Sequence, residues 1–149
     1  MKISSKGRYG LRAMVDLALN ANDGHVALYS IAERQGISLN YLEQVFSALK
    51  KAGLVRSIKG AQGGYVLGES PANLKVGTIL RALEGQLSVI DEKTENREAS
   101  DIGIQYCIKV NVWDKMNECI NSLVDSITLE DLVESHKKMI GTASSMYYI

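Results

Sequence analysis

The sequence of 149 residues is poor in the features that mark membrane, secreted and disulfide-rich proteins. No apolar run approaches the ~18 residues that a membrane span needs. The first ten residues, MKISSKGRYG, hold no apolar stretch of the signal-peptide kind. Two cysteines, Cys107 and Cys119, are too few for a disulfide framework. These absences predict a cytoplasmic globular protein, and the length suits one domain or one domain with an appendage.

Groups that bind metals or catalyse reactions are also scarce. His25 falls in the turn sequence NANDGH, and His136 falls on the last expected helix. Neither has a second ligand or a nucleophile at a suitable spacing, so neither indicates zinc or catalysis. The sequence therefore predicts a protein that is not an enzyme.

The net charge of zero hides an uneven distribution. Residues 1–81 hold 11 Lys and Arg against 5 Asp and Glu, a balance of +6, and residues 82–149 hold 6 against 12, a balance of −6. One interpretation is an ordinary scatter of surface charge, because charge alone is weak evidence of nucleic-acid binding. The other is an anionic partner for the first half only.

The first half contains the start and stop signals of three helices. We expect one helix over residues 4–20, with a serine at its N-terminus. A capping box of Ser30 and Glu33 predicts a short helix that begins at Ser30 and ends at Gly36.

The third predicted helix is LNYLEQVFSALKKAG, for which Ser38 suits the N-cap and Gly53 the end. Its apolar residues recur at i, i+3, i+4 and i+7, which is typical of a helix with one buried face. They are Leu42, Val45, Phe46 and Leu49.

Beyond the third helix the hydrophobic period changes to two. This pattern predicts strands over residues 54–58 and 65–67, joined by the turn KGAQGG. The only proline, Pro71, marks a loop, and a short helix is expected over residues 76–85.

The second half is expected to begin with an exposed, mobile loop over residues 91–101, which contain no large apolar residue. A helix resumes near Ile108, and TLED opens a last helix, before a flexible stretch GTASSMYYI. Five apolar residues of the long helix are spaced 3, 4, 3 and 4, which is typical of a helix packed along a partner helix. They are Trp113, Met116, Ile120, Leu123 and Ile127.

The glycine-rich stretch RSIKGAQGGYVLG, residues 56–68, raises the question of a nucleotide pocket. Phosphate-binding loops stand between a strand and a helix N-terminus, whereas this one is followed by a strand. The nucleotide interpretation therefore fails on context. A hairpin tip, with glycines that permit positive φ, is the remaining interpretation.

The order of helix, short helix, glycine, helix and hairpin matches a winged helix-turn-helix. The predicted fold is mainly α with a small β-hairpin wing, followed by a long dimerisation helix. The cations Arg56 and Lys59 then face DNA phosphates. The alternative is a helical domain with an idle hairpin, since the fold alone does not determine function.

The solvent side of the third helix carries polar groups that suit base edges. Glutamine pairs with adenine, and glutamate accepts a hydrogen bond from cytosine. An ordinary solvated face would also be polar, so the helix is better supported than the individual roles. The residues are Asn40, Tyr41, Glu43, Gln44 and Ser47.

Four stretches, SKGRYGLRAM, ERQGISLNYLEQVFSALKKAGLV, GGYVLG and ITLEDL, resemble the Rrf2 family of bacterial winged-helix regulators over about residues 1–133. The resemblance implies a homodimer, joined through the helix at 108–127, that binds a pseudo-palindromic operator on double-stranded DNA. It assigns the DNA contacts to the N-terminal helix, the second helix of the motif and the wing. The residues concerned are Ser38, Asn40, Tyr41, Glu43, Gln44, Lys59, Gly60 and Arg8. Lys59 replaces a family arginine, which weakens any narrow-groove selectivity.

The family branch that carries an iron–sulfur cluster uses three cysteines and a histidine. In this sequence only Cys107 matches, while Glu95, Asp101 and Val110 stand at the other positions. One thiolate does not hold a cluster that needs four ligands, so we expect no cofactor. Cys119 suits a small, half-buried apolar residue, and Cys107 is the better candidate for a thiol sensor.

Loss of the cluster ligands favours the cysteine-metabolism repressor branch, for which the resemblance implies cysteine synthase as a protein partner. Tyr148 and the carboxylate of Ile149 would dock into that enzyme, because such ends bind pockets rich in backbone N–H. The tail folding onto its own dimer is an alternative. Other functions left open are an iron–sulfur or thiol-based redox sensor and a protein-interaction module.

The expected organisation has four parts. They are a DNA-binding domain over 1–85, an exposed loop over 86–107, a dimerisation helix with a following short helix over 108–134, and a C-terminal tail over 135–149.

Overall fold

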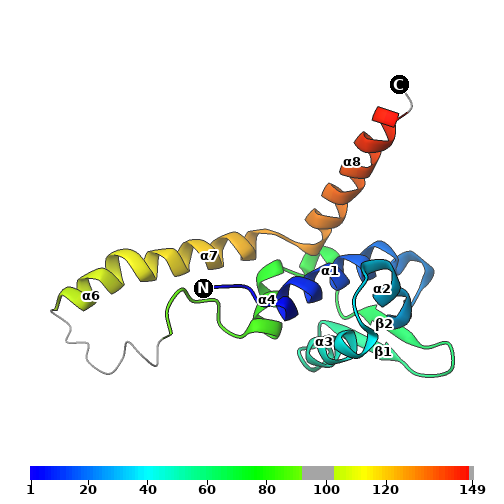
Figure 1. Ribbon diagram of the computed structural model, residues 1–149, viewed down its shortest axis with the longest axis horizontal. Coiled ribbons are helices and arrows are strands. Elements are labelled where there is room, and N and C mark those ends of the chain that lie inside the picture. Colours follow the sequence, from blue (N-terminus) through cyan, green and yellow to red (C-terminus); the bar gives the residue numbers. More distant parts are fainter. Residues whose placement is uncertain (92–102, 148–149) are drawn as a thin grey trace.

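The computed structural model describes residues 1–91 and 103–147. Its helices are α1 (Ser5–Leu19), α2 (Leu28–Gln35), α3 (Leu39–Lys51), α4 (Val76–Glu84), α6 (Ile104–Ile108), the π-helical turn η3 (Lys109–Trp113), α7 (Asp114–Ser126) and α8 (Leu129–Tyr147), with short 3-10 turns at Ala21–Asp23 and Pro71–Asn73. The two strands are β1 (Val55–Ile58) and β2 (Gly64–Leu67). Figure 1 shows a body of α1 to α4 with the hairpin, from which α6 and α7 extend on one side and α8 on another. Within the described ranges, no helix is sufficiently long and apolar to cross a membrane.

Helix α1 packs closely on α4 through two glycines. A Cβ on Gly7 would meet the Glu84 side chain, and one on Gly10 would meet Leu83. The expected serine cap of α1 does not form, because the side chain of the N-cap residue Ser4 makes no capping hydrogen bond to the helix. Instead the Glu84 carboxylate accepts hydrogen bonds from the backbone N–H groups of Ser4 and Gly7, each at 3.0 Å. A carboxylate from α4 thus satisfies donors that the α1 N-terminus leaves free.

The predicted start of the second helix is wrong by two residues. Helix α2 begins at Leu28 with Ala27 as its N-cap, and the Ala27 carbonyl accepts from the Ser30 N–H at 3.0 Å. Ser30 therefore lies in the first turn, and the capping box with Glu33 does not form. The predicted end is confirmed, because Gly36 has φ +64 in the left-handed region, where glycine is favoured.

Helix α3 forms as its sequence predicts. The Ser38 side chain accepts a hydrogen bond from the Tyr41 N–H at 3.1 Å and caps the helix. All four residues of the apolar stripe are buried in the main core with Met14, Leu17 and Ile31. Burial of this stripe fixes which face of α3 points to solvent.

The predicted hairpin is confirmed, with Val55 paired to Leu67 and Ile58 to Gly64. Strand β2 also forms an antiparallel bridge to Val26, whose N–H donates to the Tyr65 carbonyl at 2.9 Å. The Tyr65 ring also meets the Phe46 ring of α3 edge to face at 4.8 Å. The hairpin is therefore attached to the same core as α3.

The second half differs from its predicted boundaries. The helix that was expected near Ile108 begins one turn earlier, at Ile104, and continues through η3 into α7. Leu87 is buried against α4 beside Val76 and Leu80, so the expected exposed loop over 86–107 is wrong at both ends. The middle of that loop lies outside the described residues.

The predicted flexible tail is helical as far as Tyr147. Thr128 and Asp131 form a reciprocal capping box, with N–H to side-chain distances of 2.9 and 3.1 Å, which confirms the start of this helix. The helix contains one glycine, Gly141, and a glycine in a helix interior lowers helix stability by about 1 kcal/mol relative to alanine. Alanine and other residues of good helix propensity in α8 compensate for this loss. The expected division between a short helix to 134 and a tail from 135 is therefore wrong, because α8 spans both.

The predicted apolar seam is divided between two environments. Ile120 and Ile127 pack with Val124 against the cluster on α4, within the same chain. Met116 and Leu123 remain 44% and 60% exposed. The ion pair between Arg81 and Asp125, at 2.8 Å, adds to the α4–α7 contact. One side of α7 is therefore used by its own chain, and the other is free.

Candidate nucleic-acid interface

The solvent face of α3 is polar and accessible. Asn40, Glu43, Gln44 and Ser47 are exposed and line one shallow surface depression. They lie opposite the buried stripe, because residues three and four positions apart share a face of the helix. Four predicted base-reading side chains are thus brought together on one surface.

Two other predicted residues of α3 have contacts within the chain. The Tyr41 hydroxyl lies 3.1 Å from the Ser5 hydroxyl of α1, and its ring meets Tyr9 edge to face at 5.9 Å. The Ser38 hydroxyl is occupied as the acceptor of the N-cap bond. Tyr41 and Ser38 therefore hold α3 in place against α1, and only their remaining hydrogen-bonding capacity faces outward.

Arginine side chains of α1 continue the surface. The guanidinium of Arg12 lies 5.3 Å from the Tyr9 ring and donates to the Gln35 carbonyl at 2.6 Å. Arg8 stacks on the same ring at 5.7 Å and is exposed. Among the described residues its guanidinium has no hydrogen-bond or ion-pair partner, which leaves it available to an anion.

The hairpin tip presents Lys59 to solvent. Gly60 has φ +123, a backbone conformation that residues with a side chain rarely adopt. Its carbonyl accepts a hydrogen bond from the Gly63 N–H at 3.1 Å, which closes the turn. Arg56 is exposed on β1 beside the tip. In the described part of the chain neither cation has a carboxylate partner.

A buried carboxylate anchors the helix pair behind this surface. Asp16 is 3% exposed and accepts from Arg34 Nη2 at 2.7 Å and from Gln35 Nε2 at 2.9 Å. The hydrogen bond that Arg34 donates to Asp16 raises the pKa of Arg34 above its usual value. This contact joins α1 to the last turn of α2, just before the turn into α3. The only sequence signal for it is a charged residue inside the apolar stretch MVDLAL.

The donor set does not fit an iron–sulfur cluster. Cys107 is exposed on α6, where Asn111 Nδ2 donates to its carbonyl at 2.8 Å, and Cys119 is exposed on α7. Val110, at the histidine position, has no donor atom, and Glu95 and Asp101 lie outside the described residues. Over residues 1–91 and 103–147, no three His, Cys, Asp or Glu side chains gather around a point where a metal ion could bind. A cluster needs more soft ligands than this region supplies.

The fold and its exposed helix define a winged helix-turn-helix transcriptional regulator. The family model described as "Rrf2: Iron-dependent Transcriptional regulator" matches residues 3–135. The chain belongs to the Rrf2 family, whose members regulate transcription and are not enzymes.

Relatives in this family are similar over most of the chain. The transcriptional regulator IscR of Yersinia enterocolitica is 43% identical over 91% of this chain and 80% of its own, and that of Aliivibrio salmonicida is 45% identical over 89% and 77%. The solved structure of CymR, described as the global cysteine regulator of B. subtilis, has a TM-score of 0.76 and 41% identity over 91% of this chain and 98% of its own. The structure of T. potens IscR has a TM-score of 0.72 and 44% identity over 93% and 90%.

Proposed function

We propose that this protein is a cytoplasmic, homodimeric regulator that binds a specific operator sequence in double-stranded DNA. The observation that carries the proposal is the exposed polar face of α3 beside a wing whose tip lysine has no carboxylate partner in the part of the chain that the structure describes. In this arrangement α3 enters the major groove, and the wing lies along the adjacent backbone.

Each exposed side chain has a role that matches its chemistry. Asn40 and Gln44 have amide groups that pair with adenine, and Glu43 accepts from cytosine. Lys59 and Arg8 have free cationic groups that suit phosphate oxygens. Gly60 lets the wing backbone approach the DNA, and Ser38 and Tyr41 orient α3.

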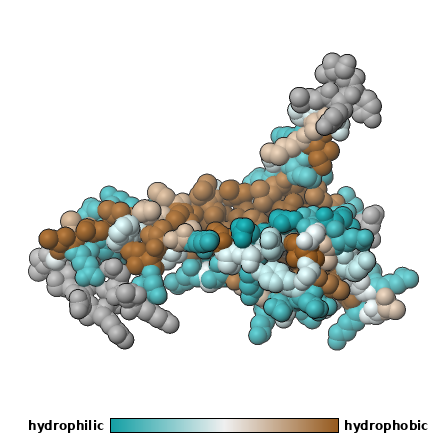
Figure 2. Space-filling model, in the orientation of Figure 1, coloured by the Kyte–Doolittle hydropathy of each residue, from teal (hydrophilic) through white to brown (hydrophobic). Residues whose placement is uncertain are grey.

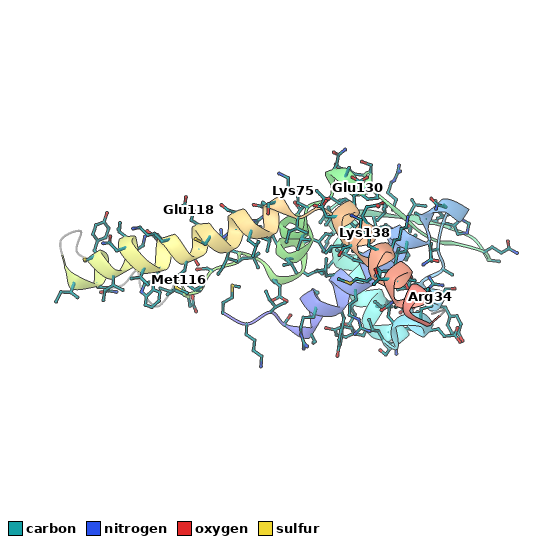
Figure 3. The ribbon with its side chains drawn as sticks, turned by 90° about the horizontal axis from the view of Figure 1, so that it is seen from above. Arg34, Lys75, Met116, Glu118, Glu130 and Lys138 are labelled. Carbon is teal, nitrogen blue, oxygen red and sulfur yellow. The ribbon has the colours of Figure 1, made fainter. Side chains whose placement is uncertain are left out.

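The dimer would use the free side of the helix α6–α7. Trp113, Met116 and Leu123 are at least partly exposed, and Figure 3 shows Met116 on the extended helix, away from the body. Ile120 and Ile127 are on the other side of the helix, where they pack against α4 of the same chain.

Genomic footprinting with the purified protein tests both parts of this function. A dimer that docks two copies of α3 protects two half-sites whose centres are one helical turn apart, about 10 base pairs, or a multiple of it. A single protected half-site at saturation would contradict the dimer. Uniform protection along the genome would contradict the sequence specificity.

We further propose that the regulated genes serve sulfur and cysteine metabolism, that the protein represses them, and that cysteine synthase is its partner. The likeness to CymR supports this, as does the lack of a cluster-type donor set in the described residues. Tyr148 and Ile149, which lie outside the described residues, are the proposed docking segment. Deleting residues 146–149 should abolish binding to purified cysteine synthase and leave operator binding intact, and unchanged enzyme affinity would remove this docking site.

The relatives named IscR and the iron-dependent family description favour a second candidate, an iron–sulfur or thiol-based redox sensor. Cys107 would be its responsive group. Anaerobic purification distinguishes the two: bound iron with visible absorbance would establish the sensor, whereas colourless, iron-free protein that binds its operator supports the first candidate.

A further inference from the structure

The connection between α1 and α2 runs beside the hairpin and carries His25, a residue that the proposed DNA contacts do not use. Val26, the next residue, exchanges two backbone hydrogen bonds with Tyr65 of β2, at 2.9 and 2.8 Å. Gly64 also lies against the Val26 backbone, where a Cβ would meet the Val26 carbonyl. This pairing adds one residue of a third strand to the hairpin and fixes the position from which the His25 side chain extends.

The His25 ring contacts the wing tip, residues 59–63, which joins the two strands. Its Nε2 forms a hydrogen bond with the backbone carbonyl of Gln62. Because a carbonyl oxygen only accepts, Nε2 carries the proton and donates the bond. In Figure 1 the hairpin projects from the body on the side where α1 leads into α2. His25 thus links the body to the end of that projection.

The composition of the wing tip favours backbone freedom. The pairing of the two strands ends at Ile58 and Gly64, and two of the five residues between them are glycines. Within the tip, the Gly63 N–H donates to the Gly60 carbonyl at 3.1 Å. A loosely held tip has to be ordered when it binds DNA, and this loss of entropy lowers affinity unless the free protein already holds the tip in place.

The wing tip lies on the surface that is expected to face DNA. In Figure 2 hydrophilic side chains project from the lower part of the body, where Figure 1 draws α3 and the hairpin. Lys59 stands three residues before Gln62, is exposed, and has no carboxylate partner in the part of the chain that the structure describes. The path of the tip backbone therefore determines where the lysine ammonium group can reach.

We propose that His25 is a positioning residue for DNA binding, which holds the wing tip so that Lys59 meets a backbone phosphate without further ordering. The inference rests on the proposed DNA-binding function and deepens it, because it adds a residue from outside the helix-turn-helix and the wing. His25 acts through the Gln62 carbonyl and does not itself contact DNA.

A double-mutant cycle between His25 and Lys59 tests this role. His25→Ala should lower affinity for the footprinted operator about two- to tenfold, the value of one hydrogen bond. Lys59→Ala should then cost less in that variant than in the native protein, because a lysine on a loose tip already contributes less. Additive effects would overturn the proposal, since they would mean that His25 acts by its own contact with DNA or through overall stability.

A conservative variant and a neighbouring control sharpen the cycle. His25→Gln should restore most of the affinity that His25→Ala loses, because a glutamine amide N–H can donate to the same carbonyl. Asn22→Ala is the control: Asn22 is exposed on the same connection, and its loss should change affinity less than twofold. Equal losses in His25→Gln and His25→Ala, or a loss in Asn22→Ala as large as theirs, would contradict the hydrogen-bond role.

The order of the tip in the free protein gives a readout that needs no DNA. NMR order parameters of the Gly60 and Gly63 amides should fall in His25→Ala and stay near the native values in His25→Gln and Asn22→Ala. Unchanged order in His25→Ala would overturn the proposal.

The wing contact and the His25 role fail in different ways. If Lys59→Ala leaves the operator affinity of the native protein unchanged, the proposed wing contact is wrong and the positioning role falls with it. If Lys59→Ala weakens binding equally in the native protein and in His25→Ala, the wing contact stands and only the role of His25 is removed.

Discussion

At the scale of single residues, the candidate interface separates groups that read bases from groups that hold position. Gln44 and Asn40 are free to meet base edges, whereas Tyr41 and Ser38 are bound within the chain. The sequence assigned all four to the base-reading segment, but it contained no sign of the Ser5 and Tyr9 contacts, because those depend on how α1 crosses α3.

Substituting Gln44 with alanine should change which sequence is preferred. Loss of a bidentate contact to adenine costs about 1–3 kcal/mol on the operator and little on duplexes already altered at that base pair. Titration against operators substituted one base pair at a time measures the effect. A uniform loss of affinity on all of these duplexes would contradict the assigned role.

Lys59→Ala should instead weaken all duplexes to a similar degree. Removing one phosphate contact lowers the slope of log affinity against log salt by about 1. Lys138→Ala is the control, because Lys138 lies on α8 (Figure 3), which rises from the side of the body opposite to α3 and the wing (Figure 1). If both variants keep the native salt slope, the wing lysine does not contact the backbone.

At the scale of elements, helix contacts explain where local sequence signals succeed and fail. The Ser38 cap and the apolar stripe of α3 depend on neighbours in the sequence, and both were predicted correctly. The α1 cap comes from Glu84 on α4, and the α2 start comes from Ala27, whose carbonyl accepts without any capping side chain. Such long-range or backbone-only contacts leave no periodic pattern in the sequence.

The α1–α4 contact depends on the absence of a side chain at Gly10. Gly10→Ala should destabilise the protein by about 1–3 kcal/mol, because the new methyl group meets Leu83 in a packed interface. Gly141→Ala is the control: its Cβ meets nothing within 4 Å, so it should stabilise the helix by up to about 1 kcal/mol. Chemical denaturation at one fixed protein concentration measures both, and equal effects would contradict the close packing.

The α4–α7 contact should weaken in acid. The hydrogen bond from Arg81 lowers the pKa of Asp125 below its ordinary value of 3.8. Ionised Asp125 therefore stabilises the folded state above about pH 4, and this contribution is lost as the pH falls through the lowered pKa.

Comparison of the native protein with Asp125→Asn tests this linkage. The asparagine variant should be less stable at pH 7, and the difference should shrink as the pH is lowered from 4 to 3. A difference in the free energy of unfolding that is constant from pH 7 to pH 3 would show that Asp125 does not act through its charge.

At the scale of the whole molecule, the order of helices and hairpin predicted the class of fold, and the charge division indicated an anionic partner for the first half. Only the structure showed that α7 serves two purposes, with one side on α4 and the other exposed. A spacing of 3, 4, 3 and 4 describes a stripe but not its partner, so it could not tell Ile120 from Leu123. The composition of GTASS likewise led to the wrong prediction of a flexible tail, because small residues of this kind are compatible with a helix that is capped at its start.

The central claim is that α3 and the wing read a particular sequence of duplex DNA. Its most direct test is the ratio of affinities of the native protein for its footprinted operator and for random duplex, both at physiological salt. The account predicts a ratio of at least about 10³, the lower end for specific DNA-binding proteins. Equal affinities for the two duplexes would contradict it.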